Sequence, residues 1–227
     1  MSTHLNIEIR NSAAAPLVFH PALRFIARFL SIVFHPLFIV SYTMAFLIFV
    51  HPAVFIGLDY RTKVLRIIHI ILLTAFMPLF AIFIMSRLKL FLHSVHVNTA
   101  KERIVPYLIT MIFYWWPWNV FRNLPDSPPV ATKFLLGSFL AICAAFFCNI
   151  FFKISIHATA AGGLLMFFLL FSFNDTYASG LYLSIAILVA GMICTARFIA
   201  SDHSSFDIYS GLFAGMLSQL IAWQFAS

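Results

Sequence analysis

The stretch CTARFIASDHSSFDIYSG, residues 194–211, places an arginine, a histidine and two aspartates between two strongly apolar segments. Charged side chains are costly at bilayer depth, so an ionisable cluster there predicts a functional site. If the segment is helical beyond its first half, His203 and Asp207 lie four residues apart on one face. A carboxylate in that position can hold an imidazole in one tautomer, as the acid partner of a nucleophilic histidine does. Gly211 and Gly215 continue this face, so we expect a second helix to pack closely behind the pair.

The composition predicts an all-α integral membrane protein whose spans form the fold. The chain has 227 residues, of which 63% are hydrophobic and 9% charged, and a mean hydropathy of +0.99. A soluble domain averages roughly 45–50% apolar and about 25% charged residues. The 14 Lys and Arg against 7 Asp and Glu indicate anionic lipid headgroups or phosphate as partners. Flanking charges that set topology account for about half of them. The scattered basic residues argue against nucleic acid.

The cysteines predict neither a metal site nor a disulfide framework. Cys143, Cys148 and Cys194 all fall inside apolar runs, their number is odd, and their spacing is not that of metal ligands. We therefore interpret them as small buried hydrophobes.

The apolar pattern predicts two parts, an N-terminal tail with an interfacial helix at residues 1–28 and a transmembrane domain at residues 29–227. His35, followed by Pro36, is interpreted as a kink in the first span and not as a ligand. Each predicted span is close to the roughly 20 residues that cross a bilayer. The spans number about seven and are expected at 29–50, 64–86, 104–121, 134–152, 158–173, 178–196 and 206–225.

Seven crossings would bring the polar interruptions of the sequence to one membrane face. The N-terminus, the 87–103 loop, and the junctions at 153–157 and 197–205 would share that face. It would hold nine Lys and Arg against five on the other face, but four of the nine belong to the candidate site or lie beside it. The orientation in the membrane is therefore left open.

This face would carry the parts that phosphoryl transfer requires. Cations stabilise charge on the phosphoryl oxygens, one histidine attacks phosphorus, and a second histidine protonates the leaving oxygen. Arginine in particular binds phosphate bidentately. The candidate residues are Lys101, Arg103 and Arg197 as anion binders, Ser155 as a hydrogen-bond donor, His157 and His203, and Asp207 behind His203.

The spacing of Arg197, His203 and Asp207 resembles the third motif of the type 2 phosphatidic acid phosphatase superfamily. That motif reads Ser-Arg, five residues, His, three residues, Asp, and Ala196 stands here in place of the serine.

The other two motifs of the superfamily are matched in part. Of the second motif, Pro-Ser-Gly-His, this chain keeps Ser155 and His157, with isoleucines where proline and glycine are expected. Of the first motif, Lys, six residues, Arg-Pro, it keeps Lys101, Arg103 and Pro106 at altered spacing. The combination is similar to a divergent membrane branch associated with bacteria of the Bacteroidetes type, and the resemblance covers about residues 85–220.

The resemblance implies a bundle with a six-helix phosphatase core plus flanking helices, located as a multi-pass protein in the bacterial inner membrane. It also implies a metal-independent reaction without a cofactor. His203 would be the nucleophile that forms a phosphohistidine, Asp207 would orient it, and His157 would be the general acid. The phosphoryl oxygens would be held by Arg197, Arg103, Ser155 and Lys101.

Each residue also has a structural interpretation. His157 could be an interfacial histidine bonded to a backbone carbonyl. Arg197 could be a snorkelling flank of a span, Lys101 and Arg103 could set topology, and His203 with Asp207 could be a buried structural pair. Their joint occurrence on one face favours catalysis.

The sequence therefore predicts an enzyme that hydrolyses a phosphate monoester or diphosphate on a lipid. Phosphatidate, phosphatidylglycerophosphate and polyprenyl diphosphate fit equally well. A non-hydrolytic lipid or anion transporter, a lipid phosphotransferase and an inactive relative remain alternatives. The sequence makes no prediction of oligomeric state.

Overall fold

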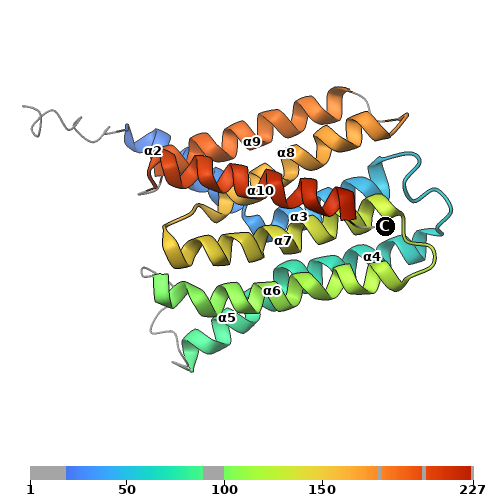
Figure 1. Ribbon diagram of the computed structural model, residues 1–227, viewed down its shortest axis with the longest axis horizontal. Helices are drawn as coiled ribbons and strands as arrows, with labels where there is room; N and C mark the ends of the chain where they lie inside the picture. The colour runs from blue at the N-terminus through green and yellow to red at the C-terminus, as the bar shows by residue number, and fades with distance from the viewer. Residues whose placement is uncertain (1–18, 89–99, 178–179, 201–202, 226–227) are drawn as a thin grey trace, which may run out of the picture.

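The computed structural model describes residues 19–88, 100–177, 180–200 and 203–225, and every regular element in these ranges is helical. Residues 1–18 of the expected N-terminal part lie outside these ranges. Figure 1 shows the helices side by side along the long axis of the molecule. The elements are α2 (Pro21–Val33), α3 (Pro36–Ala45), the π-helix η1 (Phe46–Val50), α4 (Tyr60–Ile71), the π-helix η2 (Leu72–Phe76), α5 (Met77–Arg87), α6 (Ala100–Asn123), α7 (Pro129–Phe151), α8 (Ile156–Asn174), α9 (Gly180–Ala200) and α10 (Ser205–Phe225).

The protein is a membrane protein, as its long apolar helices indicate. In the described part of the chain, four helices are long and apolar enough to cross a membrane: Tyr60–Arg87, Pro129–Phe151, Ile156–Asn174 and Gly180–Ala200. The bent pair formed by α2 and α3–η1 passes the same test as a unit and makes a fifth if it forms one broken span and not a re-entrant loop. Helices α6 and α10 contain more polar residues and are not among them. Seven crossings therefore remain a prediction.

The first span differs from its expected boundaries. The sequence predicts an interfacial helix up to residue 28 and a span at 29–50, but α2 continues to Val33 and packs against α9. The chain bends by 58° between α2 and α3. His35 caps α3, since its Nδ1 accepts a bond from the backbone N–H of Leu37 at 3.4 Å, and Pro36 occupies the first turn. The kink predicted at His35-Pro36 is confirmed.

Helices α8 and α10 pack closely through glycines, as expected from the sequence. A Cβ added at Gly211 would lie 2.7 Å from the carbonyl oxygen of Ser155, and one at Gly215 would overlap the carbonyl of Thr159. Real side chains do not approach backbone so closely, so only glycine allows this contact. It fixes the start of α8 against the start of α10, where the candidate site lies.

Successive long helices run in alternating directions in Figure 1, so that α6, α8 and α10 all begin at the end of the bundle where α2 lies. Contacts between distant residues agree with this arrangement. The backbone N–H of Ser155 donates to the carbonyl of Asp207 at 3.0 Å, and His157 contacts the carbonyl of Ser31. At the opposite end Arg66 pairs with Asp126 at 2.6 Å.

Candidate functional site

A cavity of about 450 Å³ lies between the helices, and four of the seven predicted site residues line it. They come from four separate segments: Arg103 near the start of α6, His157 near the start of α8, Arg197 near the end of α9, and His203 in the junction before α10. The cavity therefore brings together two guanidinium groups and two imidazoles from residues up to a hundred positions apart in the sequence.

The imidazole of His203 is held by Asp207. Its Nδ1 lies 3.2 Å from Oδ2 of Asp207, and both side chains are largely buried. The same carboxylate oxygen accepts the backbone N–H of Ser204 at 3.1 Å, while the hydroxyl of Ser204 accepts the backbone N–H of Asp207 at 3.2 Å. This reciprocal pair caps α10 and fixes the carboxylate. Because Asp207 occupies Nδ1, Nε2 is the ring nitrogen left for chemistry in the cavity.

The pKa of His203 lies below its ordinary value of 6.5. Burial is the main cause, and the positive charges of Lys153 and Arg197 lower the pKa further. The hydrogen bond and the charge of Asp207 act in the opposite direction. The net result favours a neutral imidazole, which is the form that can act as a nucleophile.

The ring of His157 is anchored on its Nε2 side. Nε2 lies 3.1 Å from the carbonyl oxygen of Ser31, and the ring makes an edge-to-face contact with His35, with 5.3 Å between the centroids. A carbonyl can only accept, so Nε2 carries a proton, and Nδ1 is the nitrogen that can exchange one. His157 therefore bonds a backbone carbonyl, as its structural interpretation from the sequence expects. The same ring also lines the cavity.

Ser31 also contacts Arg197, whose Nη1 donates to the Ser31 hydroxyl at 3.5 Å. The hydroxyl in turn donates to the carbonyl of Ala27 at 2.9 Å. The final turn of α2 therefore positions both an imidazole and a guanidinium of the candidate site. The bond between Arg197 and Ser31 lies within the contact between α2 and α9.

Ser155 is not among the residues that line the cavity. Its side chain is fully buried, and its hydroxyl accepts the backbone N–H of Ala158 at 3.4 Å as the cap of α8. Its backbone N–H is bonded to Asp207. In this geometry Ser155 positions the start of α8, and the phosphate contact implied by the resemblance stays a prediction. Lys101 lies in the first turn of α6, and its side chain is outside the described residues, as is Asp202.

His35 and Tyr107 also line the cavity with hydrogen-bonding groups, and neither is among the site residues predicted from the sequence. His35 lines the cavity, and because its Nδ1 accepts the N–H of Leu37, its Nε2 carries the proton in the neutral ring. Tyr107 also lines it, is 2% exposed, and its hydroxyl has no hydrogen-bond partner among the described residues. A buried hydroxyl without a partner is costly, so a ligand oxygen in the cavity would satisfy it.

The described ranges contain no group of three or more His, Cys, Asp or Glu residues arranged to hold a metal ion. The three cysteines are unpaired thiols in α7 and α9. Imidazoles, guanidinium groups and hydroxyls are among the groups that line the cavity.

Comparison with known proteins finds no relative of this chain: no family model matches it, and no curated protein or solved structure is significantly similar. The functional assignment consequently depends on the geometry of the site and on the motif resemblance of the sequence.

Proposed function

We propose that the protein is a membrane lipid phosphatase that hydrolyses a phosphate monoester or diphosphate through a phosphohistidine intermediate. The observation that carries this proposal is the His203–Asp207 pair at 3.2 Å, which adjoins a cavity lined by Arg103, Arg197 and His157. A nucleophile with its orienting carboxylate, a second imidazole and two anion-binding side chains form the set that phosphoryl transfer requires.

In the proposed reaction, Nε2 of His203 attacks phosphorus and the bond from phosphorus to the lipid oxygen breaks. Protonated His157 gives its Nδ1 proton to that leaving oxygen, which departs as the lipid alcohol or lipid phosphate. The neutral His157 then takes a proton from water, whose oxygen attacks the phosphohistidine. Phosphate leaves, and His203 and protonated His157 are regenerated.

The cationic residues would stabilise the charge on the phosphoryl oxygens in both steps. Arg103 and Arg197 lie on different helices, so they can contact the group from two sides. Arginine is suited to this role because its planar fork matches two phosphate oxygens. The proton on Nε2 of His35 and the hydroxyl of Tyr107 are further donors within the cavity.

The finer parts of the proposal come from the sequence. The resemblance implies the six-helix phosphatase core and the bacterial inner membrane, and the apolar pattern predicts the seven crossings. The structure supports the coarser statement of a helical membrane protein, with several helices that can span.

The decisive experiment is to trap the intermediate. Purified full-length protein in detergent is incubated with phosphorus-labelled lipid phosphates in excess chelator, quenched, and analysed for an acid-labile, base-stable phosphoprotein. We expect label at His203 together with release of phosphate, and neither in the His203→Ala variant. A carrier that only binds the lipid would give no phosphoprotein and no phosphate. A phosphotransferase would form the phosphoprotein but release little phosphate, and an added alcohol acceptor would carry the label away as a new phosphate ester.

A further inference from the structure

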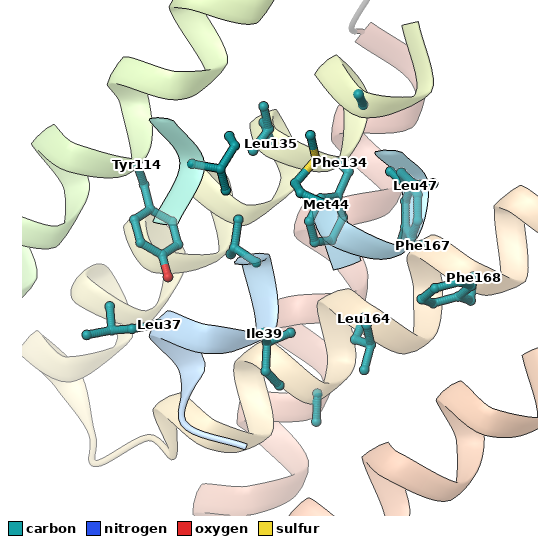
Figure 2. Close-up of a cluster of buried hydrophobic side chains, with 14 of the residues drawn as sticks. Leu37, Ile39, Met44, Leu47, Tyr114, Phe134, Leu135, Leu164, Phe167 and Phe168 are labelled. Carbon is teal, nitrogen blue, oxygen red and sulfur yellow. The ribbon is translucent and has the colours of Figure 1, made fainter. Parts of the chain in front are cut away.

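The cavity has one polar end and one apolar end. Arg103, His157, Arg197 and His203 lie at the polar end, whereas apolar side chains such as Val40, Ile82, Ile142 and Leu164 line much of the rest. Figure 2 shows part of the apolar end, where Leu37, Ile39, Tyr114, Phe134 and Leu164 approach from several helices. An amphiphile would match this division, with its anionic head at the polar end and its hydrocarbon part at the apolar end.

The hydroxyl groups in the apolar part are already bonded to the protein. Thr110 donates to the carbonyl of Pro106 at 2.8 Å, Ser138 to that of Phe134 at 3.0 Å, and Tyr114 to that of Pro36 at 3.3 Å. None of these three hydroxyls therefore needs a ligand as acceptor. A ligand's polar group is favoured only at the arginine end, and a hydrocarbon chain is suited to the remainder.

The length of the cavity is comparable to one leaflet. Arg103 and Tyr114, which both line it, are eleven residues apart on α6, which corresponds to about 16 Å along the helix axis. The hydrocarbon core of a bilayer is about 30 Å thick, so one leaflet spans about 15 Å. A hydrocarbon chain bound along this path would extend about as far from its phosphate as a lipid chain extends into one leaflet.

The volume of the cavity limits the bound ligand to one hydrocarbon chain. At about 30 Å³ for each group the size of a water molecule, 450 Å³ accommodates about fifteen such groups. A phosphate and one chain of about ten to twelve carbons fill that space. A second chain of similar length would have to remain outside the protein.

From this polarity, depth and volume we infer that the substrate is a phosphate ester of a single hydrocarbon chain, which binds inside the bundle between α3, α6, α7 and α8 with its phosphate at Arg103 and Arg197. This inference depends on the proposed phosphatase function for the fate of the phosphate, but the binding geometry can be tested separately. Two-chain phosphatidate fits the cavity less well.

The test measures kcat/KM for hexyl, dodecyl and octadecyl phosphate and for phosphatidate, at equal surface fraction in mixed micelles. We expect the value to rise from hexyl to dodecyl phosphate and to be lower for octadecyl phosphate. We also expect dodecyl phosphate to exceed phosphatidate by about tenfold or more, the scale on which a packed site rejects excess volume. Equal values for dodecyl phosphate and phosphatidate, or a rise that continues to octadecyl phosphate, would overturn the inference.

The chain offers a matched pair of serines for a second measurement. Ser138 and Ser172 are both partly buried and both donate to the carbonyl four residues earlier, but only Ser138 lines the cavity. We expect Ser138→Leu to lower kcat/KM for dodecyl phosphate about tenfold more than for hexyl phosphate, because it adds volume where the longer chain lies. Ser172→Leu should leave the profile unchanged. An equal loss for both chain lengths in Ser138→Leu would indicate a general packing defect and contradict the inference.

Non-hydrolysable alkyl phosphonates separate this inference from the proposed function. If the thermal stability of the protein rises with hexyl and dodecyl phosphonate but not with a two-chain phosphonate, while no phosphate is released from any ester, the single-chain site stands and the phosphatase proposal fails. If phosphate is released from all the lipids at similar rates, the phosphatase proposal stands and the single-chain site fails.

Discussion

Two histidine–aspartate pairs lie at opposite ends of the bundle, and their surroundings differ. Nδ1 of His203 lies 3.2 Å from Asp207, and Nε2 of His51 lies 3.2 Å from Asp175. The first pair adjoins the cavity with its two arginines. The second is enclosed by the rings of Phe46, Phe171 and Tyr182, with centroid distances of 5.1–6.1 Å.

The two rings also differ in which nitrogen is occupied. Nδ1 of His51 faces the backbone N–H groups of Ala53 and Val54 at 3.4 and 3.3 Å, and its Nε2 faces the carboxylate of Asp175 as an ion-pair contact without hydrogen-bond geometry. Both nitrogens of His51 are therefore committed to protein contacts. His203 uses only Nδ1 for its carboxylate. A short distance between histidine and aspartate consequently does not identify a catalytic pair. What supports the proposal for His203 is the second ring nitrogen, which its carboxylate leaves available beside a cavity.

The largest expected effects come from replacing the histidine of each pair by alanine. His203→Ala should lower kcat by at least about ten-thousandfold, since it removes the nucleophile, and should leave the folded protein intact. His51→Ala should leave turnover within about twofold and lower the free energy of unfolding by about 1–3 kcal/mol, because it leaves buried donors without partners. Phosphate release and thermal unfolding in detergent measure the two effects. Turnover retained in His203→Ala would disprove the nucleophile assignment.

The carboxylates provide the next comparison. Asp207→Asn places an amide beside Nδ1, which can donate to that nitrogen and so favour the tautomer with a proton on Nε2. We expect kcat to fall by about a thousandfold or more, as for other histidines that lose their orienting carboxylate. Asp175→Asn should change kcat by less than about twofold, with a loss of roughly 1–2 kcal/mol in stability. A similar loss of activity in both variants would mean that the effect of Asp207→Asn is structural.

Two arginines give a third comparison with a smaller expected effect. Arg197→Lys should lower kcat/KM about 10–100-fold, since lysine cannot present the planar fork to phosphate. Arg66, at the opposite end, contacts Asp126 and lies 5.7 Å from the ring centroids of Phe55 and Phe121. Arg66→Lys should therefore reduce stability by about 1 kcal/mol with little change in turnover. Kinetics over a range of lipid phosphate concentrations, together with thermal unfolding, measure both. Unchanged kcat/KM in Arg197→Lys would remove this arginine from the proposed site.

The local parts of this arrangement could be predicted from the sequence, because they depend on short intervals along the chain. The interval of four residues between His203 and Asp207 predicts their contact, although α10 begins only at Ser205 and the contact is made across the helix cap, not along a helical face. Gly211 and Gly215 predict the close approach of a second helix, and in the structure that helix is α8. Apolar runs of about 20 residues likewise predict most helices to within a few residues.

The long-range parts could not be predicted, because they depend on how distant helices pack. The contact between His157 and Ser31 joins residues 126 positions apart, and no pattern in either segment indicates it. The sequence does not indicate that Ser155 caps a helix, and only the start of α8 shows this role. His35 was interpreted as part of a kink, and it also contributes an imidazole to the cavity because the bend orients it there.

The smallest expected effect concerns pH. Protonation of His203 blocks the attack by Nε2, so the acid limb of kcat/KM reports its pKa in the free enzyme. Burial and the charges of Lys153 and Arg197 lower this pKa, so the limb should lie below the ordinary value of 6.5. Burial also lowers the pKa of His51, but this ring lies at the other end of the molecule, and His51→Ala should leave the limb in place. A limb above 6.5, or one that moves in His51→Ala, would show that His203 is not the group whose protonation controls turnover.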